Sequence, residues 1–250
     1  MTSFKNIDLP PIFRPFRCND LVRLGQDYDG GYIVNRTDVE KSDILISVGI
    51  KDDWSFERDF SQINDCEMVS LDRDSQVPSD DPFYVGHRQM IYKNVGIRPS
   101  YSEDLIPFEH ITSIKSNKIF LKIDIEGEEY EFLDLIIQNS NKFSAISLEF
   151  HYLSDDNNFD NLINFVSKID QKLVHFHPNN CGMGLDKEWP HVIELSFTSS
   201  DNISYDSSLT LPHSLDMPCC PQGEDYKINF LGGGTKIDSP LETWQGWWRK

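Results

Sequence analysis

A glycine-rich turn of the form G-x-G-x-x-G is missing from the 250-residue sequence. Such a turn makes room for the pyrophosphate of a dinucleotide, so its absence argues against a nicotinamide-dependent oxidoreductase. Apolar runs are short as well, and none approaches the ~18 residues of a membrane-spanning helix. The first residues, "MTSFKNIDLPP", lack the apolar segment of a signal peptide. We therefore expect a soluble cytoplasmic protein without membrane insertion.

Paired cysteines and an excess of basic residues are also missing. The five cysteines have no C-x-x-C spacing, which disfavours a disulfide framework or a zinc cage. Lysine and arginine number 23 against 41 acidic residues, giving a net charge of -18. At long range this charge repels nucleic acids and anionic membrane surfaces, so we expect a small-molecule or glycan substrate and no nucleic-acid partner. A homo-oligomer remains an open alternative.

Short β-rich runs alternate along the chain with segments that have the apolar spacing of helices. The runs are residues 43–48, 67–71, 118–125, 145–150, 172–177 and 192–197, and the helical patterns between them are 54–63, 128–138 and 159–169. This alternation predicts an α/β fold with a mostly parallel sheet. We expect one domain over residues 1–250, with an N-terminal decoration to about residue 40 and a C-terminal extension from about residue 200.

The stretch "ILISVGIKDDWSFE" ends a buried run on Gly49 and then turns into an amphipathic helix. A glycine at a strand end permits close approach of a ligand, and the helix N-terminus adds a positive dipole. Asp72 follows the next run, at about the spacing of an acid that binds both hydroxyls of a ribose. Because no pyrophosphate turn accompanies them, these residues favour a nucleoside ligand without pyrophosphate, such as S-adenosylmethionine.

The segment "FLKIDIEGEEYEFL" at 120–133 resembles the fourth-strand signature of FkbM-type S-adenosylmethionine-dependent methyltransferases. The resemblance extends to "RLGQDYDGGYIV", "SVGIKDDWSFE", "ISLEFH", "LVHFHPNNCG" and "VIELSF". It implies a Rossmann-like class I methyltransferase fold with seven strands, the last antiparallel, and methyl transfer to an oxygen, often of a sugar. It also implies a cofactor site that we expect at Ser47, Gly49, Glu57, Asp72, Asp124 and Gly31.

Three candidate catalytic residues follow two neighbouring strands. Glu149 and His151 share one face of their strand, and Asp124 lies where the preceding strand reaches the ligand crevice. Methyl transfer to an alcohol needs a base or a metal ion, because a hydroxyl is a weak nucleophile near neutral pH. We expect His151 or Asp124 to act as the base, with Glu149 orienting either one. Alternatively, the three residues bind a divalent ion such as magnesium or manganese.

The segment "HFHPNN" supplies His177, Asn179 and Asn180 as candidate substrate-binding residues, because their side chains offer donors and acceptors to vicinal hydroxyls. The tail "TWQGWWRK" is predicted to dock on the domain or on a second subunit, or else to stack on a sugar. Taken together, these patterns predict an O-methyltransferase that acts on a sugar, a glycan or a related polyhydroxylated metabolite. A non-catalytic protein that binds cofactor or glycan is the alternative from another class.

Overall fold

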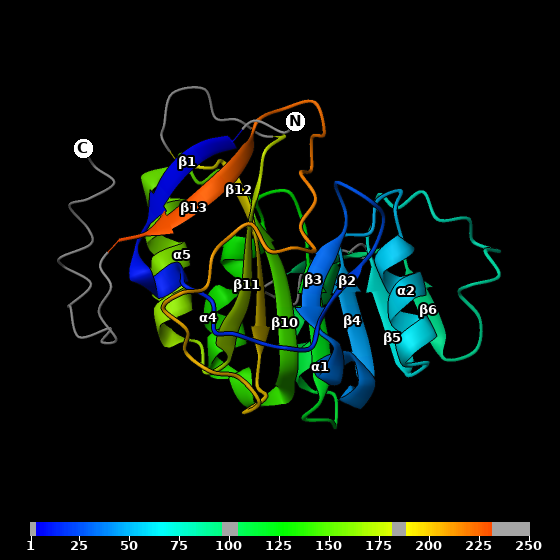
Figure 1. Cartoon of the computed structure of the whole chain (residues 1–250). Coiled ribbons are helices and arrows are strands. Elements are labelled where there is room, and N and C mark those ends of the chain that lie inside the picture. The colour runs from blue at the N-terminus through cyan, green and yellow to red at the C-terminus, as the bar shows by residue number, and fades with distance from the viewer. Residues whose placement is uncertain (1–3, 97–104, 182–188, 232–250) are drawn as a thin grey trace.

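The computed structural model describes residues 4–96, 105–181 and 189–231 (Figure 1). The tryptophan-rich tail lies outside these residues, so its docking stays a prediction. Within the described residues, no helix has both the length and the apolar character needed to cross a membrane.

A seven-stranded sheet forms the centre of the molecule. Across the sheet its strands are β11 (Lys172–Asn179), β12 (Val192–Thr198), β10 (Phe143–Phe150), β9 (Ile119–Ile123), β4 (Ile44–Val48), β5 (Glu67–Leu71) and β6 (Arg88–Ile91). Strand β12, the last of the seven in the chain, is antiparallel to both neighbours, while the other pairs are parallel. The predicted fold class is confirmed, since this Rossmann-like sheet has the strand number and directions that the class I methyltransferase resemblance implies.

Alternate residues of the central strands are buried on opposite faces of the sheet. In β4, Ile44 and Ile46 pack into the larger apolar cluster, whereas Leu45 packs into a second one. Both faces are covered by helices, which explains why the central strands read as continuous apolar runs. The helices are α1 (Arg36–Lys41), α2 (Ser55–Ile63), α3 (Phe108–Thr112), α4 (Leu133–Gln138) and α5 (Asp156–Lys168), with short 3-10 turns η1 (Pro11–Phe13), η2 (Glu129–Glu131) and η3 (Ser140–Lys142).

The larger cluster includes residues of α3, α4, α5 and η1, and the smaller one includes residues of α1, α2 and the hairpin β2–β3. This hairpin, β2 (Leu21–Leu24) with β3 (Tyr32–Asn35), is antiparallel, as the turn signal "DYDGGY" predicts. Its strand β3 lies over the sheet against β12, β11 and β10 (Figure 1). The hairpin therefore covers the same face as α1 and α2.

Two further strand pairs lie outside the main sheet. Strand β1 (Phe4–Leu9) runs parallel to β13 (Asp225–Phe230), and β7 (Asn94–Gly96) runs parallel to β8 (Leu105–Pro107). The β1–β13 pair joins two segments from opposite ends of the chain beside α5 (Figure 1). Its inward residues Ile7, Leu9 and Ile228 belong to the larger apolar cluster, which fixes the pair to the body of the protein.

Candidate functional site

A cavity of about 700 Å³ opens at the carboxyl ends of the central strands. The chain runs outward from β4 to β5 and β6, and then returns to β9 on the other side of β4. The crevice between β4 and β9 is thus the point where the winding reverses, which is where open α/β sheets bind ligands. The cavity is lined by residues that directly follow β4, β5, β9 and β10, namely Gly49, Asp72, Asp124 and His151. The volume is that of a small-molecule site.

Gly49 ends β4 with φ at +83°. A Cβ built there would lie only 1.5 Å from the carbonyl oxygen of Asp124. The close approach that requires glycine is therefore between the ends of β4 and β9, and not between the backbone and a ligand as the sequence suggested. Gly49 still lines the cavity, and its role is to let the two walls of the crevice meet.

Asp72, at the end of β5, lines the cavity and holds the loop opposite it. Its Oδ2 accepts hydrogen bonds from the backbone N–H groups of Ile50 (2.9 Å) and Lys51 (2.7 Å), and its Oδ1 accepts one from Asp74 N (2.7 Å). A carboxylate has about four acceptor positions, so roughly one remains for a ligand. Asp72 can accept one ribose hydroxyl without losing these loop contacts, but two would compete with them.

A row of polar side chains crosses the sheet next to the cavity. The strand register places Glu149 of β10 opposite Glu194 of β12, and Glu194 opposite His177 of β11. Asp124 continues the row beyond the end of β9, with a carboxylate oxygen near a carboxylate oxygen of Glu149 and a ring nitrogen of His151. All three paired residues are buried. The row therefore runs from the cavity at Asp124 into the interior at His177.

Tyr32 and Asn179 bind the carboxylates of this row. The Tyr32 hydroxyl donates to Asp124 Oδ2 at 2.9 Å and lies 3.4 Å from Glu149 Oε2. Asn179 Nδ2 donates to Glu149 Oε1 at 3.0 Å and to Asp29 Oδ1 at 3.2 Å. Burial, together with the charges of Asp124 and Glu194, raises the pKa of Glu149 well above its ordinary value. Glu149 thus favours its protonated form unless a cation lies beside it.

His151 is oriented by a carboxylate on one side and faces acids on the other. Its Nδ1 lies 3.3 Å from Glu129 Oε1, which also accepts the backbone N–H of His151 at 2.6 Å. Its Nε2 lies 3.7 Å from Glu149 Oε2 and 3.9 Å from Asp124 Oδ1. Burial lowers the pKa of His151, but Glu129 and the other acids outweigh it and raise the pKa. Nε2 is therefore the nitrogen available to a ligand.

The lining of the cavity is strongly acidic. Nine of its residues are aspartate or glutamate, whereas three, namely Lys51, Arg73 and Lys122, are basic. An anionic pyrophosphate would be repelled by this lining, while a cationic or neutral ligand would not. The electrostatics of the cavity thus agree with the missing glycine-rich turn in disfavouring a dinucleotide.

Several expected site residues lie outside the lining of the cavity. Ser47 and Glu57 are fully buried and bond to each other, with Ser47 Oγ donating to Glu57 Oε1 at 2.5 Å. Gly31 packs instead against the guanidinium of Arg23, where a Cβ would lie 2.2 Å from Nη2. None of the three is positioned to touch a ligand in the cavity, because the chain itself occupies their surroundings.

The candidate substrate-binding residues are divided in the same way. Asn179 lines the cavity, but His177 lies deeper in the polar row, with Nδ1 3.1 Å from Glu194 Oε2. Asn180 donates to the carbonyls of Cys220 (2.9 Å) and Glu224 (3.1 Å), so it fastens the C-terminal segment. The segment "HFHPNN" therefore contributes one residue to the cavity, since His177 and Asn179 share a strand face but only Asn179 lies at the carboxyl end of β11, and Asn180 points to the C-terminal segment.

Three residues of the site were not assigned by sequence reasoning. Glu129 belongs to a run of glutamates that is typical of an exposed helix start. In the structure it is fully buried, and its carboxylate accepts the backbone N–H of His151. Tyr32 reads as part of a hairpin, and its hydroxyl reaches Asp124 only in the folded chain. Lys122 shares a strand face with Asp124 in the sequence pattern, and its Nζ lies over the Tyr32 ring, 5.0 Å from the ring centroid. That period-two relation is the one signal that could have placed Lys122 at the cavity.

Comparisons with known proteins give a likeness of fold. No protein-family model matches the chain, and no curated protein matches its sequence, so the FkbM resemblance is not confirmed. Among solved structures, the fibrillarin pre-rRNA processing protein of Methanococcus jannaschii has 8% identity and a TM-score of 0.35, covering 64% of this chain and 67% of its own. M. jannaschii TYW2, in complex with AdoMet, has 8% identity and a TM-score of 0.31, covering 78% and 97%. The 16S rRNA (adenine(1408)-N(1))-methyltransferase of Catenulisporales acidiphilia has 8% identity and a TM-score of 0.32, covering 66% and 92%.

Proposed function

We propose that this protein is an S-adenosylmethionine-dependent O-methyltransferase that acts on a hydroxyl of a sugar, a glycan or a related polyhydroxylated metabolite. The observation that carries the proposal is the acidic cavity at the switch point, which brings Gly49, Asp72, Asp124 and His151 to one place. S-adenosylmethionine carries a sulfonium cation and no phosphate. It therefore suits an acidic lining that would repel a dinucleotide.

The cofactor fits the residues that are present. Asp72 retains roughly one acceptor position for a ribose hydroxyl, and the acids around Asp124 favour a positive charge at the far side of the crevice. Because Gly49 has no Cβ, the ends of β4 and β9 can meet at the base of the crevice. When bound, the cofactor supplies an electrophilic methyl group. The residues of the chain would then orient the acceptor hydroxyl in line with that group and remove its proton.

His151 is the best-placed base, because Glu129 fixes its Nδ1 while Nε2 faces the cavity. Tyr32 and Asn179 hold the neighbouring carboxylates Asp124 and Glu149 in place. Asp124 is the second candidate for the same role. Because the pKa of His151 is raised, the neutral imidazole, which accepts a proton, becomes abundant at a higher pH than in an ordinary histidine.

A divalent ion also fits the same three residues. Oxygen atoms of Asp124 and Glu149 and a nitrogen of His151 lie within 4.8 Å of one another. This donor set suits magnesium or manganese, and such an ion would make a bound hydroxyl more acidic. Asp124, Glu149 and His151 would then act as ligands, and the proton would leave to another group.

The acceptor that we infer is an uncharged polyol. The acidic lining disfavours phosphate-bearing acceptors, and Asn179 Oδ1, which accepts the backbone N–H of Cys181, retains a second acceptor position for a hydroxyl. With a net charge of -18, the protein as a whole also repels nucleic acids. These features support a soluble carbohydrate or glycoconjugate over RNA or DNA.

The test is incubation with labelled S-adenosylmethionine and a panel of saccharides and nucleotide sugars, followed by mass analysis of the products. We expect label on an oxygen of one saccharide class, and no transfer by Asp124→Asn. Calorimetry with S-adenosylhomocysteine is done in parallel. Binding without transfer to any acceptor would identify a non-catalytic protein, and efficient methylation of a nucleic acid or a protein nitrogen would refute the acceptor. Absence of binding would refute the cofactor.

A further inference from the structure

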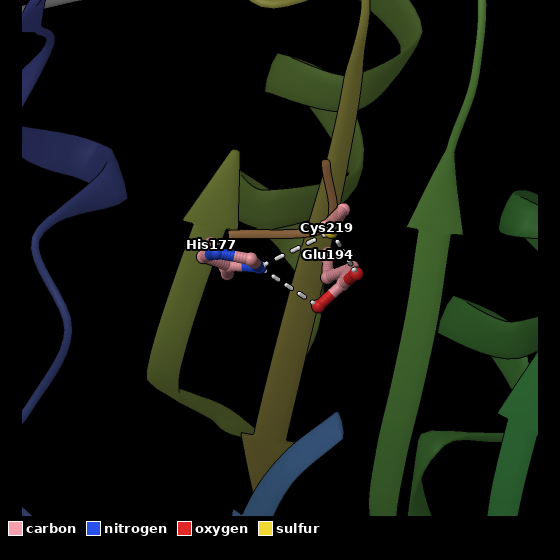
Figure 2. A group of neighbouring side chains, drawn as sticks. All are labelled: His177, Glu194 and Cys219. Atoms are coloured by element: carbon pink, nitrogen blue, oxygen red, sulfur yellow. Dashed lines mark hydrogen bonds and ion pairs between the residues drawn. The ribbon is translucent and has the colours of Figure 1, made fainter. Parts of the chain in front are cut away.

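The inner end of the polar row carries a second group of metal-binding side chains, separate from the cavity residues. His177 lies on β11, Glu194 on β12, and Cys219 on the segment between β12 and β13 (Figure 2). Figure 2 shows the imidazole and the thiol directed toward the Glu194 carboxylate. The strand register places His177 opposite Glu194, so the sheet itself fixes two members of the group.

The distances within this group are those of ligands that share one ion. His177 Nδ1 lies 3.1 Å from Glu194 Oε2, Cys219 Sγ lies 3.5 Å from Glu194 Oε1, and Sγ lies 4.0 Å from Nδ1. Bonds of 2.0–2.3 Å in a tetrahedron separate neighbouring ligand atoms by roughly 3.3–3.8 Å. A small shift of these three side chains would therefore let them bind one tetrahedral ion.

Glu194 forms an ion pair with His177 when that imidazole is protonated, and further acids lie close to this pair. Glu194 is buried directly opposite Glu149, and a carboxylate oxygen of Asp29 lies within 4.8 Å of both. Like charges opposite each other in a sheet destabilise it, and burial adds a desolvation cost. The row needs either bound protons or a bound cation at this point.

A fourth donor is present beside the group. Asp29, on the turn that leads into β3, has a carboxylate oxygen within 4.8 Å of those of Glu194 and Glu149, while the group of His177, Glu194 and Cys219 is formed without it. Glu149 is less available, because Tyr32 and Asn179 already bind its two oxygens. Asp29 is thus the candidate fourth ligand, and its exposed side chain must move toward the other three to bind the same ion.

We propose that His177, Glu194, Cys219 and Asp29 form a structural zinc site that fastens the segment around Cys219 and the turn around Asp29 to the sheet. Sulfur, nitrogen and carboxylate donors together suit zinc, whereas magnesium and calcium prefer oxygen ligands alone. Four protein ligands close the coordination sphere, as in structural sites. The site shares no ligand with the cavity group Asp124, Glu149 and His151, although Asp29 also lines the cavity, and it does not rest on the proposed activity.

Burial of the free thiol agrees with this assignment. Cys219 is a free cysteine, and its Sγ lies 3.5 Å from Glu194 Oε1. A zinc ion stabilises the thiolate and offsets the neighbouring carboxylates. Cys219 is 3% exposed, so an ion enters through local opening of its segment.

The test is measurement of metal in the full-length protein, dialysed against a chelator and reconstituted with zinc alone. We expect one zinc per chain, and cobalt in its place should give a thiolate-to-cobalt charge-transfer band. Cys219→Ser should remove the band and weaken zinc binding by more than roughly 100-fold, since partners outside the ligand sphere alone are worth 10–100-fold. His177→Gln should weaken zinc binding similarly and keep the thiolate.

Two controls make the result specific. Cys220→Ser alters the neighbouring cysteine and should keep both the zinc and the band, and Asp124→Asn should keep both because it affects only the cavity group. The proposal is overturned if the wild-type protein binds no stoichiometric zinc, if Cys219→Ser and His177→Gln bind it normally, or if only Asp124→Asn loses it. Should Cys219→Ser fail to fold, the wild-type cobalt spectrum together with His177→Gln still decides the matter.

Discussion

His151 combines a fixed orientation with access to the cavity, and its replacement tests the proposed chemistry. We expect His151→Ala to lower turnover by about 10²–10⁴-fold, the usual contribution of a general base, while S-adenosylhomocysteine binds almost normally. Turnover is measured at saturating acceptor, and binding by calorimetry. His87→Ala, which alters a half-exposed histidine paired with Asp65, should change neither quantity. Near-normal turnover of His151→Ala would remove the base assignment.

The pH dependence of turnover tests the role of Glu129. Glu129 raises the pKa of His151 against the effect of burial, so turnover should rise with pH through an inflection above the ordinary value of about 6.5. Glu129→Gln loses the charge and retains one of the two acceptor oxygens that bind the N–H groups of Gly127 and His151, and should move the inflection to lower pH. An inflection that stays in place would show that another group titrates.

The sequence predicted those site residues that follow a strand period, and missed those that depend on tertiary contacts. Glu149 and His151 are two residues apart on one strand, and the structure brings them together with Asp124. Glu129 could not be distinguished from its exposed neighbour Glu128, because only the fold decides which glutamate is buried. Ser47 was expected at the ligand for its place beside Gly49, yet its side chain turns to Glu57.

At the scale of elements, the contact between the ends of β4 and β9 shapes the floor of the cavity. Gly49→Ala would place a Cβ on the Asp124 carbonyl, so the two strand ends must separate. We expect loss of cofactor binding and a destabilisation greater than the ~1–2 kcal/mol of the left-handed backbone alone. Calorimetry and chemical denaturation measure the two effects.

Gly86 provides the matched control for this substitution. It also has a positive φ, at +68°, but a Cβ there would meet no atom within 4 Å. Gly86→Ala should therefore show only the backbone cost and bind the cofactor normally. Equal destabilisation of both variants would show that the contact between the strand ends is unimportant.

Strand prediction succeeded where burial leaves a local pattern. Five of the six predicted strands are inner members of the sheet with buried apolar runs. The sixth, β11, is an edge strand, but all of its residues except Lys172 are buried. Strand β6 was missed because it is a short edge strand of half-buried, mixed composition. The β1–β13 pair was missed because its partners are more than 200 residues apart, and no local signal reports such a pairing.

At the scale of the whole molecule, folding brings acids from distant segments into one interior row. The apolar faces of the strands set the layers, and their register then places Glu149, Glu194 and His177 side by side. A sequence reveals the apolar alternation but not the register of strands that pair out of order, as β10 and β12 do. This is why the fold class could be predicted, whereas the division between the cavity and the inner metal-binding group could not.

Stability of the whole molecule should fall as pH rises through the titration of one buried acid. Asp38 on α1 accepts a hydrogen bond from Thr198 Oγ1 at the end of β12, at 2.5 Å. Burial, only partly offset by Thr198, Asn35 and Lys41, raises the pKa of Asp38 to about 6. The unfolded value is about 3.9, so the folded state binds this proton more tightly. The resulting stabilisation is complete below pH ~4 and is lost as pH rises through about 6.

Asp38→Asn keeps an acceptor for Thr198 and cannot lose a proton. It should match the wild type near pH ~4 and exceed its free energy of unfolding above pH ~7, by on the order of 2–3 kcal/mol for a shift of this size. Denaturant unfolding across this pH range measures the difference. Glu40→Gln removes one charge from the exposed face of the same helix, so it separates the burial of Asp38 from relief of the net charge of -18. A stability gain of Glu40→Gln equal to that of Asp38→Asn would assign the effect to overall charge, because both variants lower the net charge by one unit while only one of them replaces a buried carboxylate.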